Sequence, residues 1–347
     1  MKNLNYIALA GVALLSLSAV SCKNADTDFP DHQDGVSAYF ANQYPVKVIT
    51  IGEDPEQDNT LDNKHQFNIF ATQGGAYKSR DLKIGVQVDP TLCLNLSFPD
   101  GSPVKVMPES YYELETTTLY KKQDFLFGTT VTLTDAFFAD PDAVKETYVI
   151  PLVMTSAQGA DRILTGTPVA EGDAPLRTNS SAWSVQPQDF VLFGVKFINE
   201  WTGSYLRRGV DKITENGATT ASERKADFVE NDEVVFVTTK SLRVCNFPVS
   251  TVVPDGESVK TLTCDLTLTF NGDECTVSTT TPGMTATGTG KWVKDGEKKS
   301  WGNEDRDALY LNYTVDYGSR QVTTEDVLVM RHREVAPIFN FNPVYNN

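Results

Sequence analysis

Residues 259–275 read VKTLTCDLTLTFNGDEC, and this stretch decides the fold of the second half of the chain. Apolar side chains stand at every second position from Leu262 to Phe270, which is the period of a strand with one buried face. Asn271-Gly272 follows directly, and this pair favours a tight hairpin turn. The stretch therefore predicts two antiparallel strands joined by a two-residue turn.

Two of the five cysteines, Cys264 and Cys275, lie in this hairpin. Its register places Cys275 opposite Leu268 or Phe270, two or more residue pairs from Cys264. At about 3.3 Å per residue, the two sulfur atoms are then too far apart to form a disulfide. We expect both to be small buried side chains. The chain has no Cys-x-x-Cys pair, which argues against a zinc site.

Similar β-like runs surround the hairpin. They centre on residues 204–210, 227–238, 241–246, 259–270, 275–280, 284–294, 308–317 and 326–332. Eight consecutive antiparallel strands can close into an up-and-down barrel, which removes the exposed sheet edges. Trp201 stands beside a glycine before the first run, as in many lipocalin-like barrels, and we expect it to plug the closed end. We therefore predict a lipocalin-like antiparallel β-barrel over residues 195–342.

The first half of the chain also has a β pattern. Short alternating runs near residues 46–51, 67–71, 82–88, 125–133 and 148–154 are separated by turn residues. This spacing favours an immunoglobulin-like β-sandwich over residues 44–166. A single helical turn is expected within residues 135–145. The segment 167–194 is rich in Gly, Pro, Ser and Asn, so we interpret it as a linker, in which Trp183 pins the two domains together.

The N-terminus carries a targeting pattern. Lys2 precedes an apolar run over residues 6–20, and small residues lead directly to Cys22. The run is short for a membrane span, and its end at a cysteine is typical of a bacterial lipoprotein signal, with cleavage before Cys22 and acylation of that residue. The alternative is an ordinary secretory signal with an incidental cysteine. Residues 23–43 are polar and acidic and are expected to form a tether.

The chain has a strong negative charge. Without residues 1–22 it carries 29 Lys and Arg against 46 Asp and Glu, a net charge of −17. Nucleic acids and anionic lipids bind basic surfaces, so neither is an expected electrostatic partner. A membrane would be reached through the lipid anchor alone.

Several short motifs occur in a consistent order along the chain. They are Asp62-Asn63-Lys64-His65, Gly74-Gly75, Pro108-x-x-Tyr111-Tyr112, Tyr148-x-x-Pro151-Leu152, Trp201-Thr202-Gly203 and Gly290-Lys291-Trp292. With the acylated cysteine and acidic tether, the first half resembles the Bacteroidetes immunoglobulin-like domain of unknown function found in polysaccharide-utilisation surface lipoproteins. The second half resembles a lipocalin-like domain of unknown function that often follows it. The resemblance implies a cell-surface location and a role in holding glycan near a transporter, without supplying catalytic residues.

The residues favour a non-enzyme. The chain has three histidines and lacks a Gly-x-Ser-x-Gly elbow, a Walker loop and a His-Glu-x-x-His motif. A glycosidase needs two carboxylates held across a cleft, and no segment singles out such a pair. We therefore expect neither catalytic residues nor a cofactor, with an enzyme of unrecognised site as a third alternative.

An acidic loop between the first two strands is the best place for a metal. Residues 53–62 supply many carboxylate and amide oxygens, which suit calcium. They lack the glycine and terminal glutamate of an EF-hand. We interpret the loop as solvated, with calcium as the alternative, and we predict no metal site.

Aromatic side chains are the candidates for glycan binding, because sugar rings pack their C–H faces on flat aromatic surfaces. Trp301 lies in a long polar loop over residues 295–307 and either folds back on the barrel or faces a ligand. Trp292 shares the parity of small inward residues in its strand, so core packing is its alternative role. Tyr111 and Tyr112 point to opposite faces of a strand, and Tyr112 is the third candidate.

Together these features predict an outer-membrane surface lipoprotein that binds glycan without cleaving it, beside a transporter complex. The alternative is a structural or adhesive surface subunit that binds protein. The pattern does not specify the glycan, or whether the barrel holds an open cavity.

Overall fold

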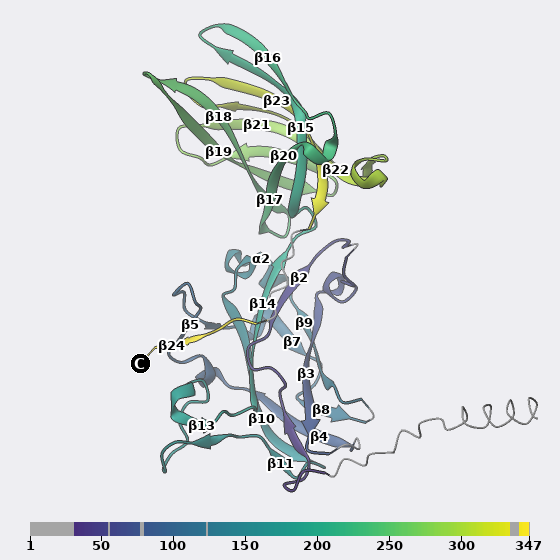
Figure 1. Ribbon diagram of the computed structural model, residues 1–347, viewed down its shortest axis with the longest axis vertical. Coiled ribbons are helices and arrows are strands. Elements are labelled where there is room, and N and C mark those ends of the chain that lie inside the picture. Colours follow the sequence, from purple (N-terminus) through teal and green to yellow (C-terminus); the bar gives the residue numbers. More distant parts are fainter. Residues whose placement is uncertain (1–30, 55, 77–79, 123, 334–339, 347) are drawn as a thin grey trace, which may run out of the picture.

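The computed structural model describes residues 31–54, 56–76, 80–122, 124–333 and 340–346, and it consists of two β-domains arranged end to end (Figure 1). The N-terminal domain is a sandwich of two sheets. The C-terminal domain is a barrel. The predicted all-β architecture is therefore confirmed.

The sandwich encloses one main core between its sheets. One sheet has the order β11 (Arg162–Ile163), β1 (Ser37–Tyr39), β3 (Gln66–Gly74), β9 (Phe127–Leu133), β7 (Tyr112–Leu114). The other has the order β2 (Val46–Thr50), β14 (Phe190–Ile198), β10 (Tyr148–Gln158), β4 (Leu82–Val88), β8 (Thr118–Lys121), with β6 (Lys105–Val106) paired to β10. Alternate residues of β3, β4 and β9 are buried between the sheets, as expected from their period of two. Phe67 of β3 and Phe193 of β14 stack across the gap, with ring centroids 5.0 Å apart.

Strand β10 is buried on both faces, which explains its continuous apolar run. Its second face belongs to a separate core that contains Val149, Val153 and Leu192. Phe341 packs into this core, and β24 (Val344–Tyr345) pairs with β5 (Leu96–Ser97) beside it. The C-terminal end of the chain therefore belongs to the sandwich, whereas we expected the barrel to continue to residue 342.

The expected linker over residues 167–194 also needs correction. Phe190, where β14 begins, is buried, and the strand lies between β2 and β10 in the sandwich. β14 has no alternation of apolar and polar residues because both of its faces are buried. The sequence pattern therefore did not indicate a strand here. Earlier in this segment, β12 (Thr167–Pro168) pairs with β13 (Trp183–Val185). Trp183 donates to the Leu176 carbonyl at 3.0 Å, and β13 lies at the end of the sandwich remote from the barrel, so this tryptophan does not join the domains (Figure 1).

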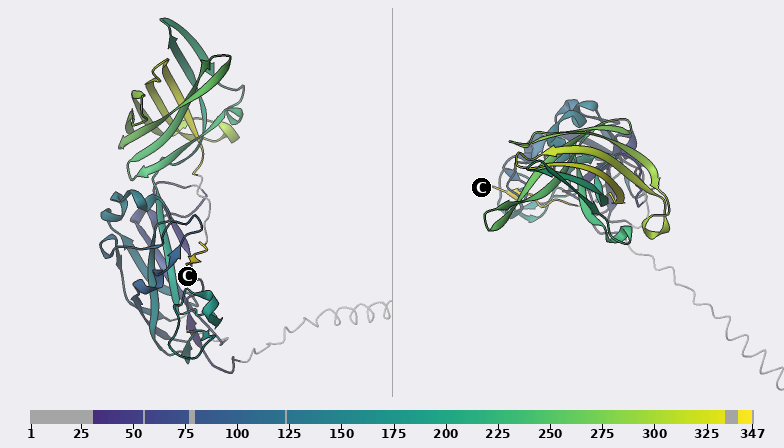
Figure 2. Two further views of the ribbon diagram at one scale, coloured as in Figure 1. Left: turned by 90° about the vertical axis from the view of Figure 1, so that its left-hand side faces the viewer. Right: turned by 90° about the horizontal axis from the view of Figure 1, so that it is seen from above.

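Eight antiparallel strands form the barrel in chain order (Figures 1 and 2). They are β15 (Gly203–Glu215), β17 (Glu233–Ser241), β18 (Val244–Asp255), β19 (Ser258–Asn271), β20 (Glu274–Thr279), β21 (Thr285–Glu297), β22 (Arg306–Asp316) and β23 (Gln321–His332). The barrel closes because β15 pairs with β23 along its length. One further strand, β16 (Ala218–Arg224), pairs with the second half of β15 and was not predicted.

The hairpin quoted first has the predicted register. Cys275 of β20 pairs with Phe270 of β19, and Cys264 lies further along β19. Cys93, Cys245, Cys264 and Cys275 are all free, and the two in the hairpin are buried. The expectation that Cys264 and Cys275 are unbridged core residues is confirmed.

Helical structure is sparse among the described residues. The expected helical turn is α2 (Asp135–Ala139), followed by a 3-10 turn over Pro141–Val144. Within the described part of the chain, no helix combines the length and the apolar character that a membrane crossing requires.

Candidate functional site

Trp301 lies in the connection between β21 and β22, which turns back at the end of the barrel that faces the sandwich. Asp305 holds this connection by accepting from the Lys299 amide at 3.0 Å and the Lys298 ammonium at 3.1 Å. These contacts lower the pKa of Asp305, the Lys299 amide contributing most. The Asp307 carboxylate accepts from the Asp295 amide at 2.8 Å. Carboxylates spaced along the loop thus fix its backbone where ordinary strand pairing stops.

The Trp301 ring is half-buried against strand β23. Its indole N–H donates to the Met330 carbonyl at 3.1 Å. The Arg306 guanidinium stands over the ring, 3.7 Å from its centroid, and the His332 ring meets it edge-on at 5.9 Å. The ring therefore folds onto the barrel, which is one of the two roles expected for it, and it also lines a cleft.

This cleft lies between the two domains and has a volume of about 600 Å³. Trp301, Met330 and charged side chains of the barrel form one wall, and Glu53, Glu56 and Asn59 of the sandwich form the other. Its lining includes seven acidic side chains against four Lys or Arg side chains, so the net charge is negative. A flat aromatic ring beside carboxylates and amides can pack against a sugar and hydrogen-bond its hydroxyls.

Arg333 fixes the relative position of the two cleft walls. Its buried guanidinium donates to the carbonyls of Ile51 at 2.9 Å and Glu53 at 2.8 Å in the sandwich, and to that of Thr202 at 3.0 Å in the barrel. A fourth bond reaches the Asn199 carbonyl at 2.7 Å. Lys294 adds an exposed ion pair with Glu53 at 2.7 Å. Sequence reasoning missed Arg333, because its partners lie up to 282 residues away.

Several polar groups of the acidic loop considered for calcium are bound to neighbouring protein groups. Asp62 is buried, pairs with the Lys47 ammonium at 2.7 Å and accepts from the Thr50 amide at 2.8 Å. The Asn59 amide donates to the carbonyls of Thr50 and Gly52. Within the described residues, no group of three or more His, Cys, Asp or Glu side chains is placed to hold a metal ion.

Two of the three aromatic candidates need correction. Trp292 is 9% exposed in the barrel core, and Tyr112 is 7% exposed in the sandwich core, so neither presents a face to a ligand. Alternation along a strand shows which residues share a face, but it does not show which of the two faces is buried. Tyr112 lies on the buried face, so its choice as a glycan-binding candidate was wrong. Its neighbour Tyr111 is partly buried against the same core, and its hydroxyl donates to Asp140 at 2.8 Å. Cys22, the predicted lipidation site, lies outside the described residues, as do residues 23–30 of the expected tether. The later part of that segment is not a tether, because β1 pairs with β3 and β11 in the sandwich, and Ala38 and Phe40 are buried in its core.

Comparisons with known proteins agree with the division into two domains. Residues 200–334 match a family model described as a domain of unknown function (DUF5627), and residues 30–161 match one whose description reads only "-like, N-terminal domain". A crystal structure of a structural-genomics protein of unknown function from Bacteroides ovatus is 43% identical, with a TM-score of 0.86, and the match covers 91% of this chain and 100% of that one. This chain belongs to the same family.

A second crystal structure from Bacteroides ovatus, of a multidomain protein including DUF1735, is much less similar. It is 11% identical with a TM-score of 0.37, over 86% of this chain and 96% of that chain. No curated protein matches the chain. The expected pair of domains of unknown function in a protein with Bacteroides relatives is confirmed.

Proposed function

We propose that this protein is a non-catalytic glycan-binding lipoprotein of the outer-membrane surface, working beside a transporter in polysaccharide utilisation. The observation that carries the proposal is the position of Trp301 on the wall of a concave, polar cleft of about 600 Å³. That volume lies in the range of small-ligand sites and fits a few units of a polymer. Binding to many equivalent units of a polymer then raises the effective affinity.

The charge of the cleft indicates which glycans it takes. Because its lining is net negative, a polyanionic polysaccharide is repelled, whereas a neutral one is not. The pKa of Asp305 is lowered by its bonds to Lys299 and Lys298, so this carboxyl is not a candidate for the protonated general acid of a glycosidase.

The binding test compares matched aromatic substitutions. Isothermal titration with soluble neutral and acidic polysaccharides should show binding of at least one neutral polymer by residues 23–347. Trp301→Ala should weaken this binding at least tenfold, whereas Phe236→Ala, which removes an exposed aromatic outside the cleft, should leave it unchanged. Equal binding by Trp301→Ala would remove the cleft from the proposal, and release of oligosaccharides by the purified protein would replace binding with catalysis.

The anchoring test uses Cys22. Membrane fractionation of cells that express the full chain should recover it with the outer membrane, and protease added to intact cells should degrade it. Cys22→Ala should release the protein from the membrane fraction. A variant that stays membrane-bound would contradict the lipid anchor without bearing on the cleft.

An adhesive or structural subunit is the second candidate, and one surface favours it. Val234 and Phe236 lie on the outer face of β17, and Phe228 is exposed nearby in sequence. Exposed apolar groups of this kind are typical of protein contacts. Capture of a surface-protein partner that is lost in Phe236→Ser and kept in Trp301→Ala would support this alternative.

A further inference from the structure

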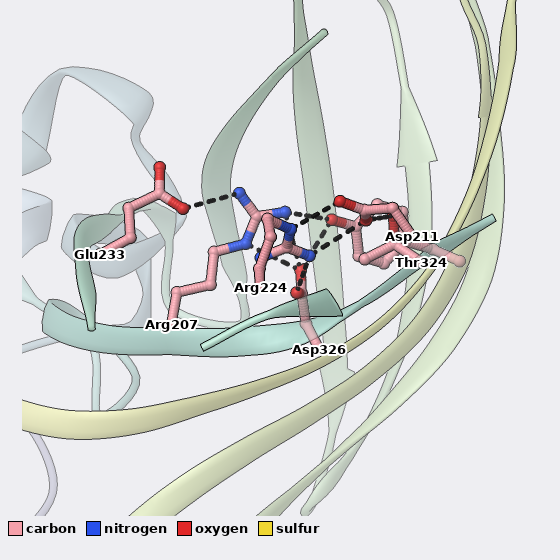
Figure 3. Close-up of polar contacts among 7 residues, drawn as sticks. Arg207, Asp211, Arg224, Glu233, Thr324 and Asp326 are labelled. Atoms are coloured by element: carbon pink, nitrogen blue, oxygen red, sulfur yellow. Dashed lines mark hydrogen bonds and ion pairs between the residues drawn. The ribbon is translucent and has the colours of Figure 1, made fainter. Parts of the chain in front are cut away.

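The interior of the barrel changes from apolar to charged along its length. Tyr205, Arg207 and Asp211 of β15 share one parity, with side chains that reach inward. Tyr205 is wholly buried in the apolar part next to the sandwich. Arg207 and Asp211 lie further along the strand, where side chains from β16 and β23 meet them (Figure 3).

A network of ion pairs fills the middle of this charged part (Figure 3). The Asp326 carboxylate, which is fully buried, accepts from Arg207 at 3.0 Å, Arg224 at 2.7 Å and the Tyr313 hydroxyl at 2.8 Å. Arg224 also binds Asp211 through two nitrogens, at 2.6 and 3.0 Å. The Asp211 carboxylate accepts a further bond from a threonine hydroxyl of β23 at 2.7 Å. Each of the two carboxylates therefore accepts three hydrogen bonds from the protein itself.

The guanidinium groups keep unused donors. Nη1 of Arg224 is buried and has no hydrogen-bond partner among the described residues. Nη1 of Arg207 reaches only the exposed Glu233 carboxylate, at 3.5 Å. Buried donors without partners are uncommon in proteins and call for a specific explanation.

A pocket of about 140 Å³ lies beside this network. Its lining is mixed: Arg207, Asp211 and Arg224 provide charge, Tyr313 provides an aromatic ring, and Val249 provides apolar surface. An enclosed apolar cavity of about 150 Å³ holds a single benzene ring, so this pocket holds the ring atoms of one sugar and not a chain, and the hydroxyls of that sugar would extend beyond it.

The pocket lies beside a gap in strand pairing. β17 pairs with β18 only between Thr238–Ser241 and Val244–Asn246, so the rest of β18 is bonded to β19 alone. Glu233 on one side of this gap and Val249 on the other both line the pocket. Pro248 and Pro254 lie on the part of β18 that is not paired with β17. Proline favours such a free edge because it has no N–H to pair with another strand.

We propose that this pocket binds one neutral, hydroxyl-rich ring, such as a monosaccharide or the end unit of a glycan. The charged side chains that line the pocket, Arg207, Arg224, Asp211 and Glu233, have no net charge, so a charged ligand would lose hydration without compensating attraction. A hydroxyl of the ring can accept from the Arg207 guanidinium and donate to the Glu233 carboxylate, since both side chains line the pocket. The C–H faces of the ring would pack on Tyr313 and Val249. This site is separate from the Trp301 cleft and does not depend on it.

Saturation-transfer NMR on residues 23–347 tests the proposal. The probes are glucose, galactose, mannose, xylose and N-acetylglucosamine, with glucuronate and glucosamine as charged counterparts. At least one neutral sugar should bind, and Val249→Phe should reduce its affinity at least tenfold by filling the pocket. Val252→Phe makes the same change at an exposed position of the same strand and should bind as the wild type does. Trp301→Ala should also retain binding.

Three results would overturn the proposal: no bound sugar, binding that survives Val249→Phe, or binding of the charged counterparts as tight as that of the neutral ring. Thermal melts establish that each variant is folded. If Val249→Phe does not fold, Val322→Phe fills the pocket from β23 and takes its place. Failure of the cleft would instead appear as loss of polymer binding with monosaccharide binding intact.

Discussion

The two halves of the barrel interior obey the same alternation but differ in chemistry. Near the sandwich, Trp201 stacks on Phe270 with ring centroids 3.8 Å apart, and the inward positions are apolar. Toward the far end, the same inward parity brings in Arg207, Asp211 and Asp326. Alternation therefore decides which way a side chain points, and the residue type decides whether that half is a packed core or a polar pocket.

The largest effect on stability is expected when a large side chain is removed from the apolar half of the barrel interior. Trp201→Ala should lower the free energy of unfolding of the barrel by about 4 kcal/mol, because it removes a large buried ring and leaves a cavity. Urea unfolding followed by circular dichroism measures this change. Phe236→Ala removes an exposed aromatic from the same domain and should change stability far less. Equal effects of the two substitutions would contradict the assignment of Trp201 to the closed end.

A smaller effect is expected in the charged half. Asp326→Asn leaves Arg207 and Arg224 without their shared buried counter-charge, and should cost about 3 kcal/mol in the same assay. Glu233→Gln neutralises the exposed partner of Arg207 and serves as the control, with little expected change. A stable Asp326→Asn variant would mean that the network is not required to hold the two arginines.

The smallest effect concerns the sandwich, where a carboxylate is held by hydroxyls instead of arginines. Burial raises the pKa of Asp140, but bonds from the Tyr148 hydroxyl, the Asp142 amide and the Tyr111 hydroxyl together lower it below its ordinary value. A carboxyl whose folded pKa is lowered stabilises the fold above its unfolded pKa of about 4, and this contribution is lost as the pH falls through the folded pKa.

Asp140→Asn should therefore reduce stability by about 1 kcal/mol at pH 7, and the difference from the wild type should shrink as the pH falls below about 4. Urea midpoints measured between pH 3 and pH 7 provide the comparison. A difference that is constant over this range would show that the charge of Asp140 does not matter and that only its packing does.

Much of the fold follows from local patterns in the sequence. The 259–275 hairpin, its register and its unbridged cysteines depend on neighbouring residues and were predicted correctly. β14 was missed because a strand buried on both faces has no alternation, and β16 was missed because it is exposed along most of its length. Periodicity detects only strands with one covered face.

The sites were harder to predict, since they depend on distant residues. Trp301 was identified from its polar loop, but the cleft exists only because Glu53 and Arg333 come together from opposite ends of the chain. The charged pocket could have been found by following the inward parity of β15 past Tyr205 to Arg207 and Asp211. β16, the strand that contributes Arg224 to the pocket, carries no comparable pattern.

The return of the chain to the sandwich has a mechanical consequence. The barrel follows directly on β14, and beyond it β24 pairs with β5 of the sandwich, so the barrel is an insertion with one covalent connection on each side. A module on one tether can swivel, whereas a module on two can only rock about the line that joins them. A force applied to the barrel by a bound polymer would then open or close the Trp301 cleft in a single plane. Both connections would bear that force.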